Sequence, residues 1–286
     1  PDNWQGFIFG ITNVPEGLSN VVSVAGGGAH TLALRSDGSL ALWGAVVGDS
    51  GLIDSTNLPP DATNVAALAP GTGAHHALVL RADGIPVDWG MTSPELTNVP
   101  SMARHIVAVA AGSWHAVALR ADGRVVAWGD SSYGSGQTNV PASATNIVAI
   151  AANEGGGAAL RADGTVITWG GGGFLTVAGV NNAVDVACMR NTHSVLVLKR
   201  DGKLTKSGSG ASPPSQATNI AAIATTSDNG IAMIGEGSPV FPGLPLNRTV
   251  VSGARAYFRG VATGAFPISY QWAYNGTNID GATNTV

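Results

Sequence analysis

The sequence is poor in charge and in long apolar runs, and each shortage excludes a class of protein. Charged residues make up only 11% of the 286 residues. The 14 lysines and arginines are outnumbered by 18 aspartates and glutamates, so no basic face for nucleic acid is expected. No stretch approaches the roughly 18 uninterrupted apolar residues of a membrane-spanning helix. The sequence therefore predicts neither a nucleic-acid partner nor a membrane span.

Cysteine and helical periodicity are also scarce. Cys188 is the single cysteine, which excludes an intrachain disulfide, and its apolar neighbours predict a small core side chain. A hydrophobic period of about 3.6 residues is nowhere sustained, which argues against a helical protein. Glycine, by contrast, accounts for 40 residues without a period of three, which indicates many tight turns.

One phrase returns six times along the chain. Its first clear copy contains Val24-Ala25-Gly26, residues 30–35, Asp37-Gly38 and Trp43-Gly44. The pairs of an acidic residue and a glycine recur about every 40 residues, the spacing of a repeat protein. They end at Gly38, Gly84, Gly123, Gly164, Gly202 and Gly237. An array of equivalent units is expected, and recognition would come from what decorates the array.

Each unit contains two short apolar runs that predict two β-strands, and the first four units contain a third run. The first run is rich in β-branched residues, the second leads into the Asp-Gly turn, and the third ends on Trp-Gly. A variable connector follows and ends in Thr-Asn-x-Pro, at residues 12–15, 56–59, 97–100 and 138–141. Short, evenly spaced strands with one Gly-aromatic mark per unit favour an all-β fold, a β-propeller.

The combination of Val-x-Val-Ala-x-Gly, His-Thr-Leu-Ala-Leu, Asp-Gly and Trp-Gly resembles the repeat of the regulator of chromosome condensation family. The resemblance covers residues 3–237, and the compact unit is similar to the bacterial type, including the secreted propeller that inhibits β-lactamases. It implies about seven blades, of which six units and the tail of another are visible. The missing strands are expected in a truncated N-terminus, and a six-bladed ring is the alternative. The resemblance also implies an extracellular or cell-surface location, although the segment that starts at Pro1 shows no signal peptide.

The repeat stops near Ser238, so we predict propeller repeats in residues 1–238 and a second domain in residues 239–286. In the tail, residues 270–272, Asn275-Gly276 and residues 281–283 resemble a bacterial immunoglobulin-like domain. A sandwich of this kind needs roughly 100 residues. The tail is therefore expected to be an incomplete immunoglobulin-like β-sandwich.

The polar and aromatic residues of the repeat predict structural roles, because a residue needed in every unit is typical of a scaffold. We expect the histidines to bond neighbouring backbone, the aspartates to form turns, and the tryptophans to pack between blades. The histidines are His30, His76 and His115. The aspartates are Asp37, Asp83, Asp122, Asp163 and Asp201. The tryptophans are Trp43, Trp89, Trp128 and Trp169.

No catalytic residue, metal ligand or cofactor site is predicted. His75 and His76 are adjacent, and adjacent residues of a strand point to opposite faces, so they are not expected to share a metal ion. The glycine runs at residues 26–28 and 170–173 lack the Lys-Ser/Thr and the helix of a phosphate-binding loop. The chain is therefore predicted not to be an enzyme.

Aromatic residues outside the repeat pattern are the candidate binding residues, because aromatic side chains on loops of a rigid scaffold anchor interfaces. They are Trp4, Phe7, Phe9, Trp114, Tyr133 and Phe174. Covering gaps between blades is the alternative role for each of them. Acidic connector residues would steer a basic partner to the same face. They are Asp2, Asp49, Asp54, Glu95 and Asp130.

The leading functional hypothesis is a non-catalytic scaffold, exported by a bacterium, that binds another protein or an extracellular polymer through one propeller face. The family resemblance implies an alternative, inhibition of a secreted enzyme such as a β-lactamase. It also implies nucleotide exchange on a small GTPase, but the connectors hold no wedge-like or basic set. A polysaccharide-active enzyme that uses the central opening would need paired acids on one face.

Overall fold

The structure is a computed structural model, and the elements whose bounds it gives are β-strands. It describes residues 13–44, 46–48, 51–53, 58–69, 71, 74–90, 97–130, 136–171, 177, 179–189, 194–208, 211–225, 229–236, 238–239, 262 and 268–283. No helix within these ranges is long and apolar enough to cross a membrane.

Five antiparallel three-stranded sheets and one two-stranded sheet follow one another along the chain, and we number them as units 1 to 6. Units 1 to 3 are β1 (Val21–Gly26), β2 (His30–Arg35) and β3 (Leu40–Gly44); β6 (Val65–Leu68), β7 (Ala77–Arg81) and β8 (Pro86–Trp89); β9 (Ile106–Ala111), β10 (His115–Arg120) and β11 (Val125–Gly129). Units 4 to 6 are β12 (Ile147–Ala152), β13 (Gly156–Arg161) and β14 (Val166–Gly170); β15 (Ala183–Cys188), β16 (Val195–Lys199) and β17 (Leu204–Ser207); β18 (Ile220–Thr225) and β19 (Gly230–Ile234). A separate hairpin, β4 (Val46–Gly48) and β5 (Gly51–Ile53), follows unit 1.

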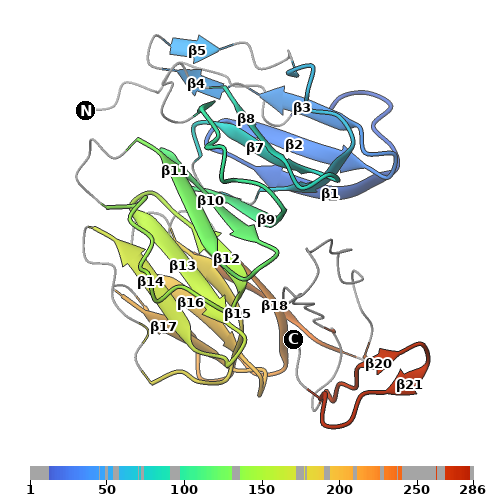
Figure 1. The fold of residues 1–286 in the computed structure, drawn as a ribbon, viewed down its shortest axis with the longest axis vertical. Helices are drawn as coiled ribbons and strands as arrows, with labels where there is room; N and C mark the ends of the chain where they lie inside the picture. The colour runs from blue at the N-terminus through green and yellow to red at the C-terminus, as the bar shows by residue number, and fades with distance from the viewer. Residues whose placement is uncertain are drawn as a thin grey trace.

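The units are arranged side by side in an arc (Figure 1). We call the three strands of a unit inner, middle and outer, in chain order. Each inner strand contacts the inner strand of the next unit, in the order β1, β6, β9, β12, β15 and β18. Residues from β1, β12, β15 and β18 line one cavity of about 360 Å³, so the inner strands surround a common axis.

The middle strands are the most buried part of each unit. Ala116, Val117 and Ala118 in β10 are fully buried, because the neighbouring units cover both faces of the sheet. A strand that is covered on both faces is a continuous apolar run rather than an alternating one. One cluster between units 2 and 3 joins Leu78 and Leu80 of β7 to Val109 and Trp128. The core is therefore a series of layers between sheets.

A repeated hydrogen bond joins each unit to the next. The glycine of the middle-to-outer turn accepts a bond from the first amide of the next inner strand, at 2.9 to 3.1 Å. The bonds run from Val65 to Gly38, Ile106 to Gly84, Ile147 to Gly123, Ala183 to Gly164 and Ile220 to Gly202. We call this bond the unit link.

Two backbone positions with positive φ make the unit link possible. The turn glycines have φ values of 72° to 82°, which glycine adopts without steric cost. The residue before the inner strand is also left-handed in five units, four times as Asn and once as His105. The carbonyl of that residue accepts a bond from the residue after the middle strand, as in Ala82 to Asn64 at 2.8 Å. The Asp-Gly repeat of the sequence is therefore a contact between units as well as a turn.

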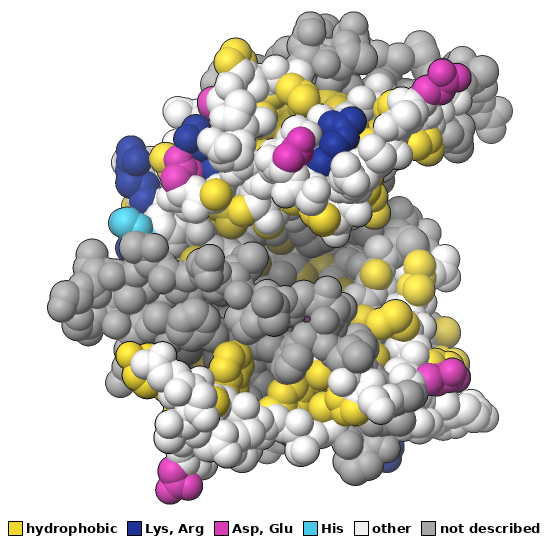
Figure 2. Space-filling model, turned by 90° about the vertical axis from the view of Figure 1, so that its right-hand side faces the viewer, with side chains coloured by type: hydrophobic (Ala, Val, Ile, Leu, Met, Phe, Trp, Pro, Cys, Tyr) yellow, Lys and Arg dark blue, Asp and Glu magenta, His cyan; other side chains and the backbone are white. Residues whose placement is uncertain are grey.

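Both ends of the array expose apolar side chains. In β1, Val22 and Val24 are 62% and 66% exposed, and in β19 Ile231 and Ile234 are 58% and 61% exposed. The side of the molecule where β1 and β18 lie shows hydrophobic side chains in both its upper and lower parts (Figure 2). No third strand of unit 6 is present among the described residues. The described part of the array is thus an open arc.

In the tail, the described residues include a short hairpin of β20 (Ala273–Tyr274) and β21 (Thr277–Asn278). Its turn is Asn275-Gly276, with φ values of 47° and 80°, which is the chemistry of a tight hairpin. The proposed division at residue 238 and the immunoglobulin-like sandwich stay predictions.

The unit link predicts a large cost for a side chain at Gly164. Gly164 has a φ of 82°, and a Cβ there would lie 2.5 Å from the carbonyl oxygen of Asn181. Gly164→Ala should lower the free energy of unfolding by about 2–4 kcal/mol, from left-handed strain plus displacement of unit 5. Urea denaturation followed by circular dichroism measures this loss.

Gly179→Ala is the matched control, because Gly179 has a φ of 76° but nothing within 4 Å of a Cβ. It should cost only the backbone strain, about 1–2 kcal/mol. If Gly164→Ala and Gly179→Ala lower the free energy of unfolding by the same amount, the contact of Gly164 with the next unit contributes nothing to stability.

Candidate functional site

The strand directions place two kinds of loop on opposite rims of the array. His30 at the start of β2 pairs with Gly44 at the end of β3, and Gly26 at the end of β1 pairs with Thr31. The inner-to-middle loops and the beginnings of the connectors therefore share one rim, which we call the variable rim. The Asp-Gly turns lie at the other, which we call the turn rim.

At the turn rim, the five repeated aspartates accept hydrogen bonds within their own turns. Each carboxylate accepts the backbone amide two residues further on, at 2.9 to 3.2 Å. Hydrogen bonds from Ser39 and Thr165 lower the pKa values of Asp37 and Asp163. Asp83 and Asp122 also pair with the arginines two residues before them. These carboxylates form turns and do not converge on a common point.

The three repeated histidines lie at the starts of the middle strands and are buried. His76 makes the fullest set of contacts. Its Nδ1 lies 2.6 Å from Oδ1 of Asp88, and its Nε2 lies 3.2 Å from the carbonyl oxygen of Gly112 in unit 3. The second carboxylate oxygen of Asp88 accepts the indole N–H of Trp128, also in unit 3, at 3.1 Å. This network joins units 2 and 3 through side chains.

His76 and Asp88 form a charged pair in the interior. Burial by itself lowers the pKa of His76, but the Asp88 carboxylate more than offsets it, and the net shift is upward. Burial raises the pKa of Asp88, opposed by His76 and Trp128. Because acceptors face both ring nitrogens, the ring can donate to both only as an imidazolium. The geometry therefore favours the charged imidazolium beside a carboxylate.

His30 and His115 differ from His76 because no carboxylate faces them. Burial, together with the charge of His76, lowers the pKa of His30 to about 4 and that of His115 to about 3. The His115 ring packs over Gly112, where a Cβ would come within 2.4 Å of Nδ1. Both rings are thus neutral packing elements at pH 7.

Unit 4 replaces the histidine by Gly156 and uses another residue for the same contact. Asn153 donates to the carbonyl oxygen of Met189 in unit 5 at 2.8 Å, the counterpart of the bond from His76 to Gly112. Its side-chain oxygen accepts the amides of Gly155 and Gly156 at 3.1 Å. Sequence reasoning missed Asn153 and Asp88, although each is a polar residue at a position that is small or apolar in the first unit.

The tryptophans at the ends of the outer strands pack against the preceding unit. Trp89 contacts the cluster that contains Leu32 and Leu34 of β2, and Trp128 and Trp169 are each 5% exposed. The indole of Trp169 donates to the carbonyl oxygen of Gln137 at 2.9 Å. Trp43, in unit 1, lies opposite Thr31 in the sheet ladder.

At the variable rim, one candidate binding residue lies within the described residues. Trp114 stacks on His75 of unit 2, with ring centroids 4.5 Å apart and an interplanar angle of 21°. The amide of Asp130 donates to the carbonyl oxygen of Trp114 at 2.9 Å. The other candidates lie outside the described residues, namely Trp4, Phe7, Phe9, Tyr133 and Phe174, and so do Asp2, Asp49, Asp54 and Glu95.

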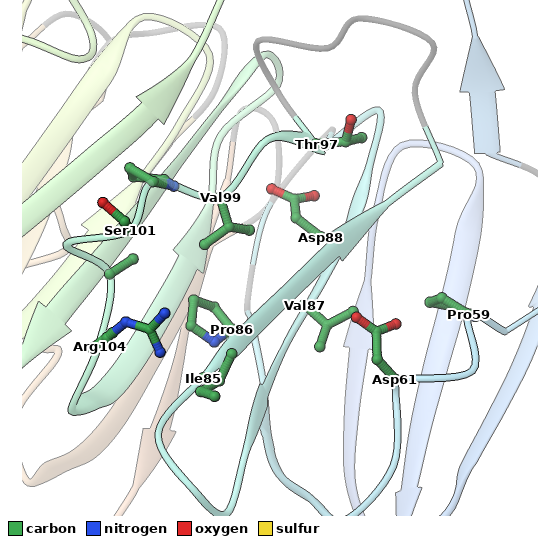
Figure 3. Close-up of a pocket in the computed structure, with 12 residues that line it drawn as sticks. Pro59, Asp61, Ile85, Pro86, Val87, Asp88, Thr97, Val99, Ser101 and Arg104 are labelled. Atoms are coloured by element: carbon green, nitrogen blue, oxygen red, sulfur yellow. The ribbon is translucent and has the colours of Figure 1, made fainter.

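Two cavities of the described residues have titratable side chains in their walls. A groove of about 360 Å³ runs along the outer edge of β8, with Asp61 and Arg104 on either side of the strand (Figure 3). Asp88 lies in its wall but is held by His76 and Trp128. In the axial cavity, Asp185 is the one carboxylate among the described lining residues, and glycoside hydrolysis needs two. Within the described ranges, no three His, Cys, Asp or Glu side chains are placed to hold a metal ion.

Cys188 also lines the axial cavity, but burial raises the pKa of its thiol to about 12. A thiol of this kind is protonated at neutral pH and is a poor nucleophile. It packs with Val186 and Val195 in the cluster between units 4 and 5.

Residues 106–135 match the sequence model of the regulator of chromosome condensation (RCC1) repeat. This segment contains β9, β10 and β11, which form unit 3. No curated protein sequence matches the chain.

Several solved structures are similar to the chain in fold. Prp20p of Saccharomyces cerevisiae aligns with a TM-score of 0.59 and 19% identity, over 74% of this chain and 68% of that one. Human WBSCR16 aligns with a TM-score of 0.57 and 17% identity, over 76% and 72% of the two chains. The ectodomain of the Arabidopsis thaliana receptor kinase ACR4 aligns with a TM-score of 0.52 and 18% identity, over 69% and 70%. The chain has the all-β propeller fold predicted from its repeats.

The buried neutral histidines predict a loss of stability in acid. The folded pKa of His115 is about 3, against an ordinary value of 6.5, so below pH 6.5 the unfolded chain binds more protons at this site. Stability should therefore fall as the pH drops from 6.5 toward 3. His115→Ser, with the residue that Ser194 supplies in unit 5, should reduce this loss by roughly 1 kcal/mol per pH unit. Urea unfolding at pH 7.5 and pH 5 measures it.

The exposed His105 provides the control, since Asn stands at the same position in other units. In His105→Asn, the difference in the free energy of unfolding between pH 7.5 and pH 5 should equal that of the parent protein. If His115→Ser loses as much stability between pH 7.5 and pH 5 as the parent protein, the buried ring of His115 does not cause that loss.

Proposed function

We propose that this chain is a non-catalytic scaffold that binds another protein through its variable rim. The observation that carries the proposal is the stack of Trp114 on His75, which places an aromatic pair across two units at this rim. The repeated aspartates are bonded within their turns, and the buried Trp128 and Trp169 pack between units. The repeat residues therefore serve the fold, and the rim residues are left for recognition.

The stack is held by the backbone on both sides. The amide of His75 donates to the carbonyl oxygen of Ser113 at 3.3 Å, and the amide of Asp130 fixes the carbonyl of Trp114. Trp114 is partly exposed, whereas Ser113 and His115 on either side of it are fully buried. A large aromatic side chain that is already ordered loses little entropy on binding, and tryptophan is enriched among interface hot spots.

The distribution of charge supports a partner with basic groups. Most basic residues of the described repeats lie in or beside the turn rim, namely Arg35, Arg81, Arg104, Arg120, Arg124, Arg161, Lys199, Arg200 and Lys203. The variable rim instead carries Asp130 and Glu154 in units 3 and 4. The five repeated aspartates offset part of the basic charge of the turn rim, and Lys206 lies near the variable rim, so the variable rim is mildly acidic. A mildly acidic face attracts a partner with basic groups.

The similar structures support protein binding in general. Prp20p binds Gsp1p and histones. Because a fold does not determine a function, we expect the rim residues of this chain to determine which protein it binds. Export of the chain stays a prediction from the resemblance, and an extracellular polymer as partner stays a hypothesis from the sequence.

Replacing Trp114 should weaken partner binding without unfolding the array. Trp114→Ala removes an anchor whose loss typically costs about 1–3 kcal/mol, so affinity should fall by roughly tenfold or more. The immobilised chain would be used to enrich proteins from the source organism, with quantitative mass spectrometry. A candidate is accepted only when the purified protein binds the chain in calorimetry.

Met102→Ala is the matched control, because Met102 is an apolar side chain that is 61% exposed in the turn before β9, at the other rim. It should leave the affinity unchanged. A partner whose binding falls with Met102→Ala and not with Trp114→Ala would place the binding surface on the turn rim and refute the proposal.

A further inference from the structure

The chain contains two pairs of an asparagine followed by a glycine, Asn229-Gly230 and Asn275-Gly276. In such a pair the backbone nitrogen of the glycine reaches the side-chain amide carbon of the asparagine, because glycine has no side chain to block the approach. The attack closes a five-membered succinimide ring and releases ammonia. The pair is therefore chemically labile wherever its backbone is free to rotate, and the two pairs of this chain differ in that freedom.

Asn275-Gly276 forms the turn between β20 and β21 and is exposed to water. All residues from 273 to 280 are exposed, and Tyr274 beside the turn is 73% exposed. A Cβ built on Gly276 would meet nothing within 4 Å. Water and base therefore reach the amide of Gly276, and the succinimide ring has space to form.

Few contacts hold this turn closed. Both of its residues have positive φ, as a two-residue hairpin turn requires, and ring closure needs rotation about the Cα–C bond of Asn275. The turn must therefore open first. Two residue pairs oppose the opening, Ala273 with Asn278 and Tyr274 with Thr277. A two-stranded hairpin is at best marginally stable in water, so we expect the tip to open often.

The base of the hairpin is anchored, which confines the opening to its tip. The amide of Trp272 donates to the carbonyl oxygen of Ala282 at 3.0 Å, and the amide of Ile279 donates to that of Trp272 at 2.9 Å. The side-chain amide of Gln271 donates to the carbonyl oxygen of Ile279 at 2.8 Å. Local opening of this kind requires far less free energy than global unfolding.

Asn229-Gly230 has the same chemistry but a more constrained backbone. Gly230 is the first residue of β19 and pairs with Thr225, at the end of a ladder of five residue pairs with β18. A Cβ at Gly230 would lie 2.9 Å from Cδ2 of Leu196 and 3.1 Å from Cε of Met189, so this backbone packs against unit 5. Ring closure at Asn229 would disturb both contacts, and we expect it to be slower.

We propose that Asn275 is a site of spontaneous deamidation, in which the backbone nitrogen of Gly276 is the nucleophile and isoaspartate is the main product. This nitrogen loses its proton to base and forms a bond to Cγ of Asn275, and the bond from Cγ to Nδ2 breaks. Nδ2 takes a proton from water and leaves as ammonia. The site lies in the tail hairpin and does not depend on the variable rim.

Water then opens the succinimide ring without any change of oxidation state. Attack at the backbone carbonyl carbon of residue 275 gives isoaspartate, and attack at Cγ gives aspartate. In isoaspartate the main chain runs through Cγ and is one methylene longer. A two-residue turn fixes the register of its hairpin, so the pairing of β20 with β21 should be lost in this product.

The test follows the purified full chain during incubation at pH 6 and pH 8. Trypsin releases Asn275 in the peptide of residues 260–286 and Asn229 in that of residues 207–248. Mass spectrometry detects the gain of one mass unit, and electron-transfer fragmentation distinguishes isoaspartate from aspartate. Asn278 is a matched control in the same peptide as Asn275, because the β-branched Ile279 follows it and hinders ring closure.

Two further samples separate the roles of the glycine and of the hairpin. Gly276→Ala places a side chain beside the attacking nitrogen, and the open space around Gly276 means that the rest of the chain should fold unchanged. A synthetic peptide of residues 272–278 gives the rate of deamidation in the absence of the hairpin.

We expect Asn275 to react at least tenfold faster than Asn229 and Asn278, with isoaspartate in excess over aspartate. The reaction should be faster at pH 8 than at pH 6, because the attacking amide must lose its proton. Gly276→Ala should slow it at least tenfold. A smaller difference from Asn229, an unchanged rate in Gly276→Ala, or a rate in the chain more than tenfold below that of the synthetic peptide would overturn the proposal.

Discussion

The contact between consecutive units is the constraint on which this molecule depends. A three-stranded sheet whose middle strand is apolar on both faces cannot stand alone in water, so each unit must be covered by its neighbours. The unit link sets the distance and register between neighbouring units, because the carbonyl oxygen of the turn glycine in one unit accepts a hydrogen bond from the first inner-strand amide of the next. The repeat of about 40 residues is the sequence signature of this one bond and of the burial around it.

Polar groups within the layers show how one position tolerates different chemistry. The Asp88 carboxylate favours the charged form of His76, whereas burial and the charge of His76 lower the pKa of His115, which has no facing carboxylate. Unit 4 omits the histidine and lets Asn153 reach the backbone of the next unit. Breaking a buried pair by removing one partner is costly, about 3–5 kcal/mol, so loss of either His76 or Asp88 alone would weaken the interface between units 2 and 3.

Much of the fold could be predicted from the sequence, since each copy of the repeat shows its strands and its turn independently. The roles of Asp88 and Asn153 could not, because both depart from the repeat and act across a unit boundary. Yet the signal was present: their partners Trp128 and Met189 lie 40 and 36 residues away, about one repeat length. β17 was also missed, because Ser207 stands where the other outer strands end in tryptophan. The rim site could be predicted only as a set of aromatics, since which of them meet depends on loop conformation.

Among the described residues, unit 6 has two strands and each other unit has three, and this difference has a mechanical consequence. Unit 3 is held by β7, β12 and its own outer strand, while unit 6 rests on β15 and β16 along one side only. In the described part of the array, β19 is the strand nearest the carboxyl-terminal tail in the sequence, so a force applied through the tail acts first on its pairing with β18. Under tension, the described array is therefore expected to open first at unit 6, next to the tail.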